Sequence, residues 1–315
     1  MKNKRIVFMG TPMFAAHVLE GLIENNYNIV AVVTQTDKKI GRKQIVTFTP
    51  VKEVALKYNL PVLQPRKIRE EYAEIVDYQP DLIITCAYGQ IIPQVLLDLP
   101  KCGCINTHGS LLPKYRGGAP IQWSIINGEK ETGVTVMYMD KKMDEGDILF
   151  KEALPIEEAD TNESMFEKLS DLALKMLLEH LDDIIAGNVN PIKQNNEEAT
   201  YAYNLSKEDE FINFNEDLTK VYNHIRGLLS NPGAYGIIDG KKYKFHKVRR
   251  SDEILCEASV VYGLHDGAIA VGTKNGTILI DEIQSEGKNK MPAKAFYNGA
   301  GKNLVGKRFE ETLCH

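Results

Sequence analysis

Short apolar runs alternate with amphipathic stretches along the first part of the chain. Between residues 14 and 23 the apolar positions recur at helical spacing, and Thr49 followed by Pro50 is typical of the start of a helix. The pattern predicts strands over 5–9, 29–33, 61–63 and 81–85, and helices over 14–23, 50–58 and 68–77. Strands that alternate with helices indicate an α/β domain with a parallel sheet covered on both faces.

Three more strand-like segments and one long helix continue this pattern. The strands are predicted over 103–106, 132–138 and 149–154. The helix has Asp160 or Thr161 as its N-cap and ends near Ala186. The next residues, 188–199, are rich in Asn, Gln and Glu and include Pro191, which indicates an exposed linker.

The pattern changes again after the linker. A helix is predicted near 217–229, and the short alternating runs beyond it are separated by the turn pairs Asp239-Gly240, Asp266-Gly267 and Asn275-Gly276. Such pairs are strong hairpin signals, so we predict a small antiparallel barrel in this region. The predicted organisation is an α/β domain over 1–189, a linker over 190–205 and a C-terminal barrel domain over 206–315.

Composition narrows the class of protein. The chain has 315 residues, enough for two domains, and its 43% hydrophobic and 26% charged residues are ordinary for a globular protein. A formal net charge of -5 excludes a polycation of the histone type but not a local basic patch. The five cysteines have neither disulfide-framework nor zinc-knuckle spacing, and no apolar run approaches the ~20 residues of a membrane span. We therefore expect a protein of the reducing cytoplasm, without a metal or a membrane partner.

The segment 104–120 carries the clearest chemical pattern. Asn106 and His108 alternate with less polar neighbours at the end of a predicted strand, so both point to one side of the sheet. Ligands of open parallel sheets bind beyond the carboxyl ends of the strands. The residues alone leave two interpretations open: a functional pair, or a capped strand end with a hydrogen-bonded core histidine.

A second polar cluster occupies 139–147, between two predicted strands. Asp144 and Asp147 flank Gly146, which permits a tight turn. Without other information, an ordinary acidic surface turn is the favoured interpretation of this cluster.

Two segments concentrate positive charge. Residues 37–44 are expected to form a long polar loop between a strand and a helix, and they carry four basic side chains. Residues 241–250 carry six, interleaved with Tyr243, Phe245 and His246. Residues 206–315 hold 16 basic and 15 acidic side chains, a net charge of +1, whereas the rest of the chain has a net charge of -6. A basic strand on a small barrel suits contacts with an RNA backbone, and Phe245 is expected in the barrel core. The alternative is a solvated loop and a solvated strand face.

The order of the polar residues is similar to that of a known family. Asn106-x-His108, Ser110-Leu-Leu-Pro113 and Tyr115-Arg-Gly-Gly-x-Pro120 together resemble the signature of formyltransferases that use 10-formyltetrahydrofolate, in which an Asp-x-Gly-Asp turn, here at Asp144, completes the site. The resemblance covers the whole chain and implies a Rossmann-like formyltransferase domain followed by an OB-like barrel. Members that formylate an aminoacyl-tRNA are also similar at 8–15, 34–35, 49–52 and 231–235.

The resemblance also implies a mechanism. The α-amine of methionine esterified to initiator tRNA would attack the formyl carbon directly, and its pKa of about 7.7–8 leaves a useful uncharged fraction near neutral pH. Asn106 and His108 would donate hydrogen bonds to the oxygen of a tetrahedral intermediate, and Asp144 would orient or charge His108. No covalent enzyme intermediate and no metal are needed. The residues implied to bind the folate are Ser110, Leu111, Leu112, Pro113, Tyr88, Gly89, Gln90 and Ile92.

The same resemblance implies where initiator methionyl-tRNA binds. Arg42 is the contact expected at the acceptor stem, with Lys38 and Lys43 beside it, and Lys241 and Lys244 are expected to contact the tRNA from the barrel. We expect the protein to be a monomer.

Three other functions compete with this interpretation. A folate-dependent formyltransferase for a small amine needs neither basic segment. A nicotinamide-dependent reductase would fit the strand, Gly10 and helix at the start, but the full Gly-x-Gly-x-x-Gly fingerprint is missing. A non-catalytic RNA-binding protein would have no need of Asn106 and His108.

Overall fold

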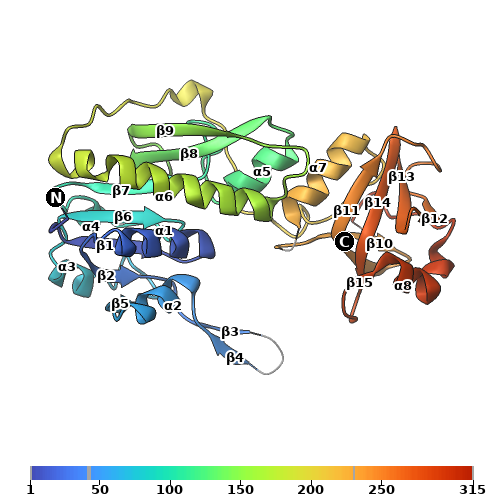
Figure 1. Cartoon of the computed structure of the whole chain (residues 1–315), viewed down its shortest axis with the longest axis horizontal. Helices are drawn as coiled ribbons and strands as arrows, with labels where there is room; N and C mark the ends of the chain where they lie inside the picture. Colours follow the sequence, from blue (N-terminus) through green and yellow to red (C-terminus); the bar gives the residue numbers. More distant parts are fainter. Residues whose placement is uncertain (1, 41–43, 230, 314–315) are drawn as a thin grey trace. The chain divides into compact units, whose positions relative to one another are not determined.

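The computed structural model describes residues 2–40, 44–229 and 231–313 (Figure 1). Contacts divide the chain into two compact units, of which the first comprises Met1–Pro120, Glu131–Pro155 and Phe166–Tyr203. The second unit comprises Ile121–Lys130, Ile156–Met165 and Asn204–His315. This division follows contacts and not the order of the chain, so the domain limits at 189 and 206 stay a prediction.

A seven-stranded sheet forms the centre of the first unit. The strand order is β5-β2-β1-β6-β7-β8-β9, and the first five strands run parallel while β8 and β9 are antiparallel to their neighbours. The parallel sheet expected for the whole domain is therefore wrong for these last two strands, which the short segment 139–147 can join only in an antiparallel pair. The strands are β1 (Ile6–Gly10), β2 (Ile29–Val33), β5 (Val62–Leu63), β6 (Leu82–Cys86), β7 (Cys104–His108), β8 (Glu131–Tyr138) and β9 (Ile148–Pro155).

Helices cover both faces of this sheet (Figure 1). On one face, Val7 and Ile83 belong to an apolar cluster with Ile75 of α3 and Leu96 of α4. On the other face α1 packs against α6, where the side chain of Leu174 fills the space beside Gly21. The helices are α1 (Met13–Glu24), α2 (Pro50–Lys57), α3 (Ala73–Asp77), α4 (Gln94–Leu97), α5 (Pro120–Ile126) and α6 (Asn162–Ala186), with α5 and the first turn of α6 in the second unit.

Two local predictions for the helices had different outcomes. The N-cap at Thr49 is confirmed, because its hydroxyl oxygen accepts a hydrogen bond from the backbone N–H of Lys52. The helix predicted over 68–77 is wrong in its first half, since α3 begins at Ala73. The backbone N–H of Ile68 donates instead to Oε1 of Gln90, and this side-chain acceptor holds the chain outside a helix.

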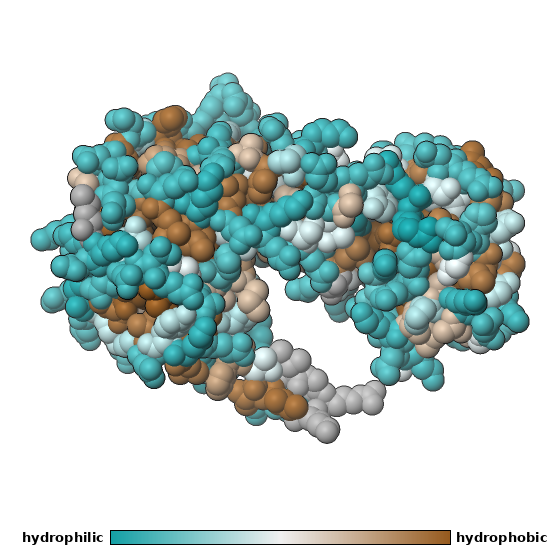
Figure 2. All heavy atoms as spheres, in the orientation of Figure 1, coloured by the Kyte–Doolittle hydropathy of each residue, from teal (hydrophilic) through white to brown (hydrophobic). Residues whose placement is uncertain are grey.

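The basic segment near residue 40 contains a hairpin where a long loop was expected. β3 (Lys38–Ile40) pairs with β4 (Ile45–Thr47) in antiparallel register, and the β-branched run at 45–47 explains the strand. Lys52 anchors its base through a 2.6 Å ion pair with Asp37. Ile45 and Val46 are exposed on this hairpin, which is hydrophobic at its surface (Figure 2).

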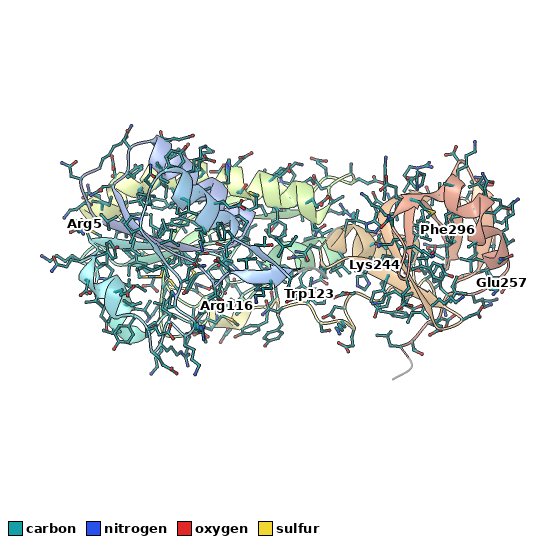
Figure 3. The ribbon with its side chains drawn as sticks, turned by 90° about the horizontal axis from the view of Figure 1, so that it is seen from below. Arg5, Arg116, Trp123, Lys244, Glu257 and Phe296 are labelled. Carbon is teal, nitrogen blue, oxygen red and sulfur yellow. The ribbon has the colours of Figure 1, made fainter. Side chains whose placement is uncertain are left out.

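The second unit is built on an antiparallel sheet with strand order β10-β11-β14-β13-β12, and β15 pairs with β14. The turn pairs at 239–240, 266–267 and 275–276 each join two neighbouring strands, as predicted. Phe245 lies in the core, as expected, together with Phe214, Phe309 and Phe296 (Figure 3). The elements are α7 (Leu218–Leu228), β10 (Ala234–Ile238), β11 (Lys241–Ser251), β12 (Val261–His265), β13 (Ala268–Thr273), β14 (Gly276–Ser285), β15 (Met291–Pro292), α8 (Ala293–Asn298) and the 3-10 helix η2 (Ala300–Leu304).

Arg226 of α7 explains why the segment Ile156–Met165 belongs to the second unit. The guanidinium of Arg226 is buried and donates to the backbone carbonyls of Glu157 and Asp160, at 2.9 and 2.7 Å. Burial lowers the pKa of Arg226 from its ordinary value. Within the described parts of the chain, no helix is both long enough and apolar enough to cross a membrane.

Candidate active site

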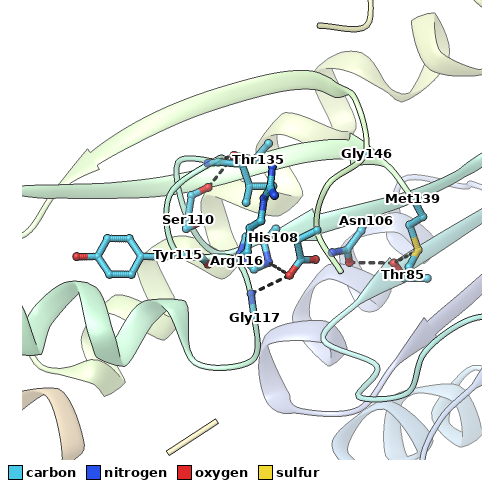
Figure 4. Close-up of polar contacts among 12 residues, drawn as sticks. Thr85, Asn106, His108, Ser110, Tyr115, Arg116, Gly117, Thr135, Met139 and Gly146 are labelled. Carbon is cyan, nitrogen blue, oxygen red and sulfur yellow. Dashed lines mark hydrogen bonds and ion pairs between the residues drawn. The ribbon is translucent and has the colours of Figure 1, made fainter. Parts of the chain in front are cut away.

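The carboxyl end of β7 carries Asn106 and His108 (Figure 4). His108 is buried, with only 6% of its side chain exposed. Its Nε2 atom lies 2.8 Å from the carbonyl oxygen of Tyr115. A carbonyl oxygen only accepts hydrogen bonds, so Nε2 carries a hydrogen and Nδ1 is the ring nitrogen that remains for other partners.

Asp144 approaches His108 from the turn between β8 and β9. Oδ2 of Asp144 lies 3.7 Å from Nδ1 of His108 and accepts a hydrogen bond of 2.9 Å from the backbone N–H of Gly117. The backbone of Asp144 is left-handed, with φ of 53°, a conformation that residues other than glycine seldom adopt. Gly146 is required in the same turn, because a Cβ atom there would collide with the carbonyl oxygen of Tyr138.

Asn106 faces the neighbouring strand β6. Its Oδ1 atom accepts a hydrogen bond of 2.8 Å from the hydroxyl of Thr85, the residue opposite it in the register. This bond orients the amide so that Nδ2 is the end left to donate. The structure therefore brings the three residues that the resemblance names, Asn106, His108 and Asp144, to one end of the sheet.

The segment 110–113 forms a rigid turn beside this end of β7. The hydroxyl of Ser110 donates to the carbonyl of Lys114 at 2.6 Å, and Thr135 of β8 both donates to the carbonyl of Ser110 and accepts from the N–H of Leu112. Ser110 and Leu112 are buried, whereas Leu111 and Pro113 are partly exposed. Contacts with a ligand from this turn would thus come from the two exposed side chains and from the backbone.

The segment 88–92 follows β6 and is more structural than the resemblance implies. Tyr88 and Ile92 are core residues, and burial raises the pKa of the Tyr88 phenol. Gln90 is held by the N–H of Ile68 and by Gln35. Gly89 has a φ of 87°, and a Cβ atom there would lie 3.6 Å from Nε2 of Gln35, which is ordinary contact distance. The positive φ is therefore the reason for a glycine at this position.

This segment fits a folate co-substrate. The backbone at Gly89, which follows a parallel strand, and the amide end of Asn106 that is left to donate suit a flat heterocycle with several polar edges. The hydroxyl of Tyr88 is buried and has no hydrogen-bond partner among the described residues, which leaves one polar atom to be satisfied.

Sequence reasoning missed a buried network behind Asp144. Arg116 is 1% exposed, and its guanidinium donates to Oε1 of Gln194 and to Oδ1 of Asn196 while lying 3.4 Å from the carboxylate of Glu145. Arg116 belongs to the quoted motif but had no assigned role. Gln194 lies in the segment that was expected to be exposed, and for this residue the expectation is wrong.

The structure describes only some of the residues predicted to contact tRNA. Arg42 and Lys43 lie outside the described residues, and Lys38 is exposed on β3. On β11, Tyr243 and Phe245 point into the core. Lys241 is exposed and Lys244 half-buried on that strand (Figure 3).

Ion pairs divide the basic residues of β11 into two groups. Arg249 binds Asp281 and Asp266, and Arg250 binds Glu158. In contrast, Lys241, Lys242, Lys244 and Lys247 have no ion pair with any described residue. Within the described chain, the charges of these four lysines are not neutralised by an ion pair, although Nζ of Lys242 lies 3.4 Å from the centroid of the Tyr235 ring.

The remaining reactive side chains in the described part of the chain are its thiols and its possible metal ligands. It contains no group of three or more His, Cys, Asp or Glu side chains that could hold a metal ion. Cys86, Cys102, Cys104 and Cys256 are free thiols, and Cys314 lies outside the described residues. Burial raises the pKa of Cys86 to about 12, so this thiol stays protonated at neutral pH.

Comparisons with known proteins agree with this site. A family model described as formyl transferase matches residues 4–181, and one described as formyl transferase, C-terminal domain, matches residues 204–301. The methionyl-tRNA formyltransferase of Latilactobacillus sakei subsp. sakei (strain 23K) is 46% identical over 304 residues, which are 95% of this chain and 96% of that protein. The methionyl-tRNA formyltransferase of Enterococcus faecalis (strain ATCC 700802 / V583) is 47% identical over 307 residues, 96% of this chain and 98% of that protein.

A solved structure confirms the fold. HypX from Aquifex aeolicus, crystallised in complex with tetrahydrofolic acid, matches 96% of this chain with a TM-score of 0.69 and 20% sequence identity. The match covers 48% of HypX, so this chain spans about half the length of that protein. The two family models and the relatives at nearly full length confirm the family that the motifs predicted: the chain belongs to the formyltransferase family, among the methionyl-tRNA formyltransferases.

Proposed function

We propose that the chain transfers the formyl group of 10-formyltetrahydrofolate to the α-amine of methionyl initiator tRNA, with Asn106, His108 and Asp144 as its catalytic residues. The observation that carries the assignment of these residues is the arrangement around His108. One ring nitrogen is held by the carbonyl of Tyr115, and the other faces the carboxylate of Asp144. A histidine that is hydrogen-bonded on one side and faces a carboxylate on the other is oriented for proton transfer.

His108 acts through Nδ1. The hydrogen on Nε2 is engaged by Tyr115, so only Nδ1 exchanges a proton or donates to the substrate. When Nδ1 holds a proton, the carboxylate of Asp144 at 3.7 Å stabilises the positive ring electrostatically. The gap is too long for a direct hydrogen bond, so a proton would pass between the two groups through a water molecule or the reacting amine that contacts both from the side.

Asn106 supplies the neutral donor. Its Nδ2 donates to the oxygen on which negative charge develops as the amine attacks, while Thr85 keeps the amide in the required orientation. A fixed donor of this kind costs no reorganisation during the reaction, because its orientation is set before substrates bind.

The folate supplies a formyl group at an activated nitrogen when it is bound. Leu111, Pro113 and the backbone around Gly89 would hold it at the carboxyl ends of β6 and β7, next to Asn106. The Thr135 hydroxyl, bonded to both Ser110 and Leu112, keeps the turn 110–113 in shape for that contact.

The tRNA is held by the basic residues. The lysines of β11 attract its phosphates, and Lys38, Arg42 and Lys43 act nearer the acceptor end, with Arg42 suited to planar multidentate contacts. A cytoplasmic location and a monomeric state belong to the same proposal.

An acceptor panel tests the proposed reaction. The full chain is incubated with 10-formyltetrahydrofolate and, separately, with initiator methionyl-tRNA, elongator methionyl-tRNA, another aminoacyl-tRNA and small amines such as an amino sugar nucleotide. We expect formyl transfer to initiator methionyl-tRNA above all others. Faster transfer to a small amine would contradict the proposal and favour the competing small-substrate formyltransferase.

A further inference from the structure

Gln194 is buried in the middle of an exposed segment. It follows α6 in the sequence and is 9% exposed, whereas its neighbours Lys193 and Asn195 are exposed. A long polar side chain is rarely buried unless all its hydrogen-bonding groups are used. One hydrogen-bond partner of this amide, Asp144, belongs to the proposed active site.

The amide of Gln194 joins two segments of the site. Its Nε2 donates to the carbonyl oxygens of Asp144 and Gly146, at 2.8 and 2.7 Å. Its Oε1 accepts from Nε and Nη2 of Arg116, at 3.2 and 2.8 Å. Carbonyls need donors and a guanidinium needs acceptors, so only a neutral amide in this orientation satisfies both sides.

The two segments that Gln194 joins are those that hold His108. Tyr115, the partner of Nε2, directly precedes Arg116, and Asp144 is the partner of Nδ1. Tyr115 and Asp144 both have left-handed backbones, with φ of 59° and 53°. Such conformations are unfavourable for residues other than glycine and persist only where surrounding contacts enforce them.

The contacts that enforce them come from the segment containing Gln194. The backbone N–H of Tyr115 donates to the hydroxyl of Thr200, and the N–H of Arg116 donates to the carbonyl of Thr200. Gln194 itself binds the carbonyl of Asp144. Arg116 and Glu145 form an ion pair that closes the network.

We propose that Gln194 is a positioning residue that sets the geometry of the His108–Asp144 pair, and this rests on the catalytic roles proposed above. Gln194 and Thr200 then support the catalytic site, although both lie in the segment that connects the domains. Loss of the Gln194 amide would remove this donor from the carbonyls of Asp144 and Gly146 and leave the guanidinium of Arg116 with only Asn196 and Glu145. The Asp144 turn would then relax away from His108.

The test compares formyl transfer by the full chain and two variants, Gln194→Met and Asn195→Ala. Methionine keeps the length of the side chain but forms none of the four hydrogen bonds. We expect Gln194→Met to lower kcat about 10- to 100-fold, because small displacements of catalytic groups have effects of this size. KM for 10-formyltetrahydrofolate should change less than about threefold. Asn195→Ala, which removes an exposed amide bonded only within its own turn, should leave both constants unchanged.

Coupling to Asp144 separates positioning from a general loss of stability. In an Asp144→Asn background, Gln194→Met should cause little further loss of kcat, since the pair is already impaired. Equal losses in both backgrounds would overturn the proposal, as would a lower Tm with an unchanged kcat per folded molecule. If Asp144→Asn is fully active, the proposed role of Asp144 fails. If Asp144→Asn is impaired but Gln194→Met is not, only the role of Gln194 fails.

Asn196→Ala provides the same test if Gln194→Met does not fold. Asn196 is exposed and accepts one hydrogen bond from Arg116, so its loss weakens the network by one contact. A smaller fall in kcat that disappears in the Asp144→Asn background supports the proposal. A normal kcat, or a fall that is equal in both backgrounds, overturns it.

Discussion

Nδ1 of His108 lies 3.7 Å from Oδ2 of Asp144, and Nε2 of the same ring lies 2.8 Å from the carbonyl oxygen of Tyr115. Each ring nitrogen therefore faces an oxygen acceptor, and the histidine cannot rotate without losing one of them. The first partner is a charged side chain on the turn after β8, and the second is backbone next to the turn 110–113. The reaction chemistry proposed for this chain depends on the first contact.

Asp144→Asn tests that dependence. The change keeps the size of the side chain and removes its negative charge, so it no longer stabilises a protonated His108. We expect kcat for formyl transfer to fall on the order of 10²- to 10⁴-fold, with tRNA binding little changed. Asp140→Asn is the matched control, because Asp140 is exposed in the same segment and bonds only to the adjacent backbone N–H. Equal activity of the two variants would reduce Asp144 to a turn residue.

Thr85→Val tests how Asn106 is oriented. Valine has the shape of threonine but cannot donate to Oδ1 of Asn106, so the amide loses the contact that fixes its direction. We expect kcat to fall about 10-fold or more, because a correctly aimed donor is worth that much in similar sites. Thr107→Val is the control, since Thr107 is buried on β7 and points to the opposite face. A loss of activity in Thr107→Val as large as that in Thr85→Val would show that packing, not orientation, is responsible.

The lysines of β11 give a prediction about salt. Lys241, Lys242, Lys244 and Lys247 changed one at a time to Ala should weaken tRNA binding for any tRNA sequence. Each change should lower the slope of log K against log salt by roughly 0.7–0.9 where a phosphate contact is lost. Arg249→Gln is the control, because Asp281 and Asp266 already neutralise Arg249. A slope that changes with Arg249 but not with the lysines would contradict the assignment.

The buried thiol of Cys86 predicts that the free energy of unfolding falls at alkaline pH. Burial raises the pKa of Cys86 to about 12, so the folded chain keeps a proton that the unfolded chain loses above its ordinary thiol pKa of about 8.5. The unfolded state then binds fewer protons, and the free energy of unfolding falls as pH rises from about 8.5 toward 12. Urea unfolding between pH 8 and about 10.5 measures this slope. Cys86→Ala should show a shallower decline than the unchanged chain, and identical slopes would refute the prediction.

Prediction from the sequence works best for helices and strands that are determined by residues close together in the chain. The strands β1, β2 and β6 consist almost entirely of buried apolar residues, and these apolar runs predicted the strands. Asn106 and His108 were paired by the two-residue period of one strand. In contrast, the helix predicted to include Ile68 was wrong there, because the backbone N–H of Ile68 bonds to Gln90, 22 residues away. No local pattern reveals that contact.

The rest of the site depends on contacts over long distances in the chain. Asp144 looked like a surface turn, and only the resemblance selected it. Gln194 gave no signal at all, since its partners Asp144 and Arg116 lie 50 and 78 residues away and its neighbours are polar and exposed. A buried amide inside an exposed linker becomes visible only once the fold brings those segments together.

The single-turnover rate of formyl transfer by His108→Ala tests the central claim most directly. The variant is mixed in excess with 10-formyltetrahydrofolate and a limiting amount of initiator methionyl-tRNA, and formylated tRNA is followed over time, with tRNA affinity measured separately. The account predicts a rate reduced on the order of 10²- to 10⁴-fold at unchanged tRNA affinity. A rate close to that of the unchanged chain would contradict it, because the His108–Asp144 pair would then have no part in the reaction.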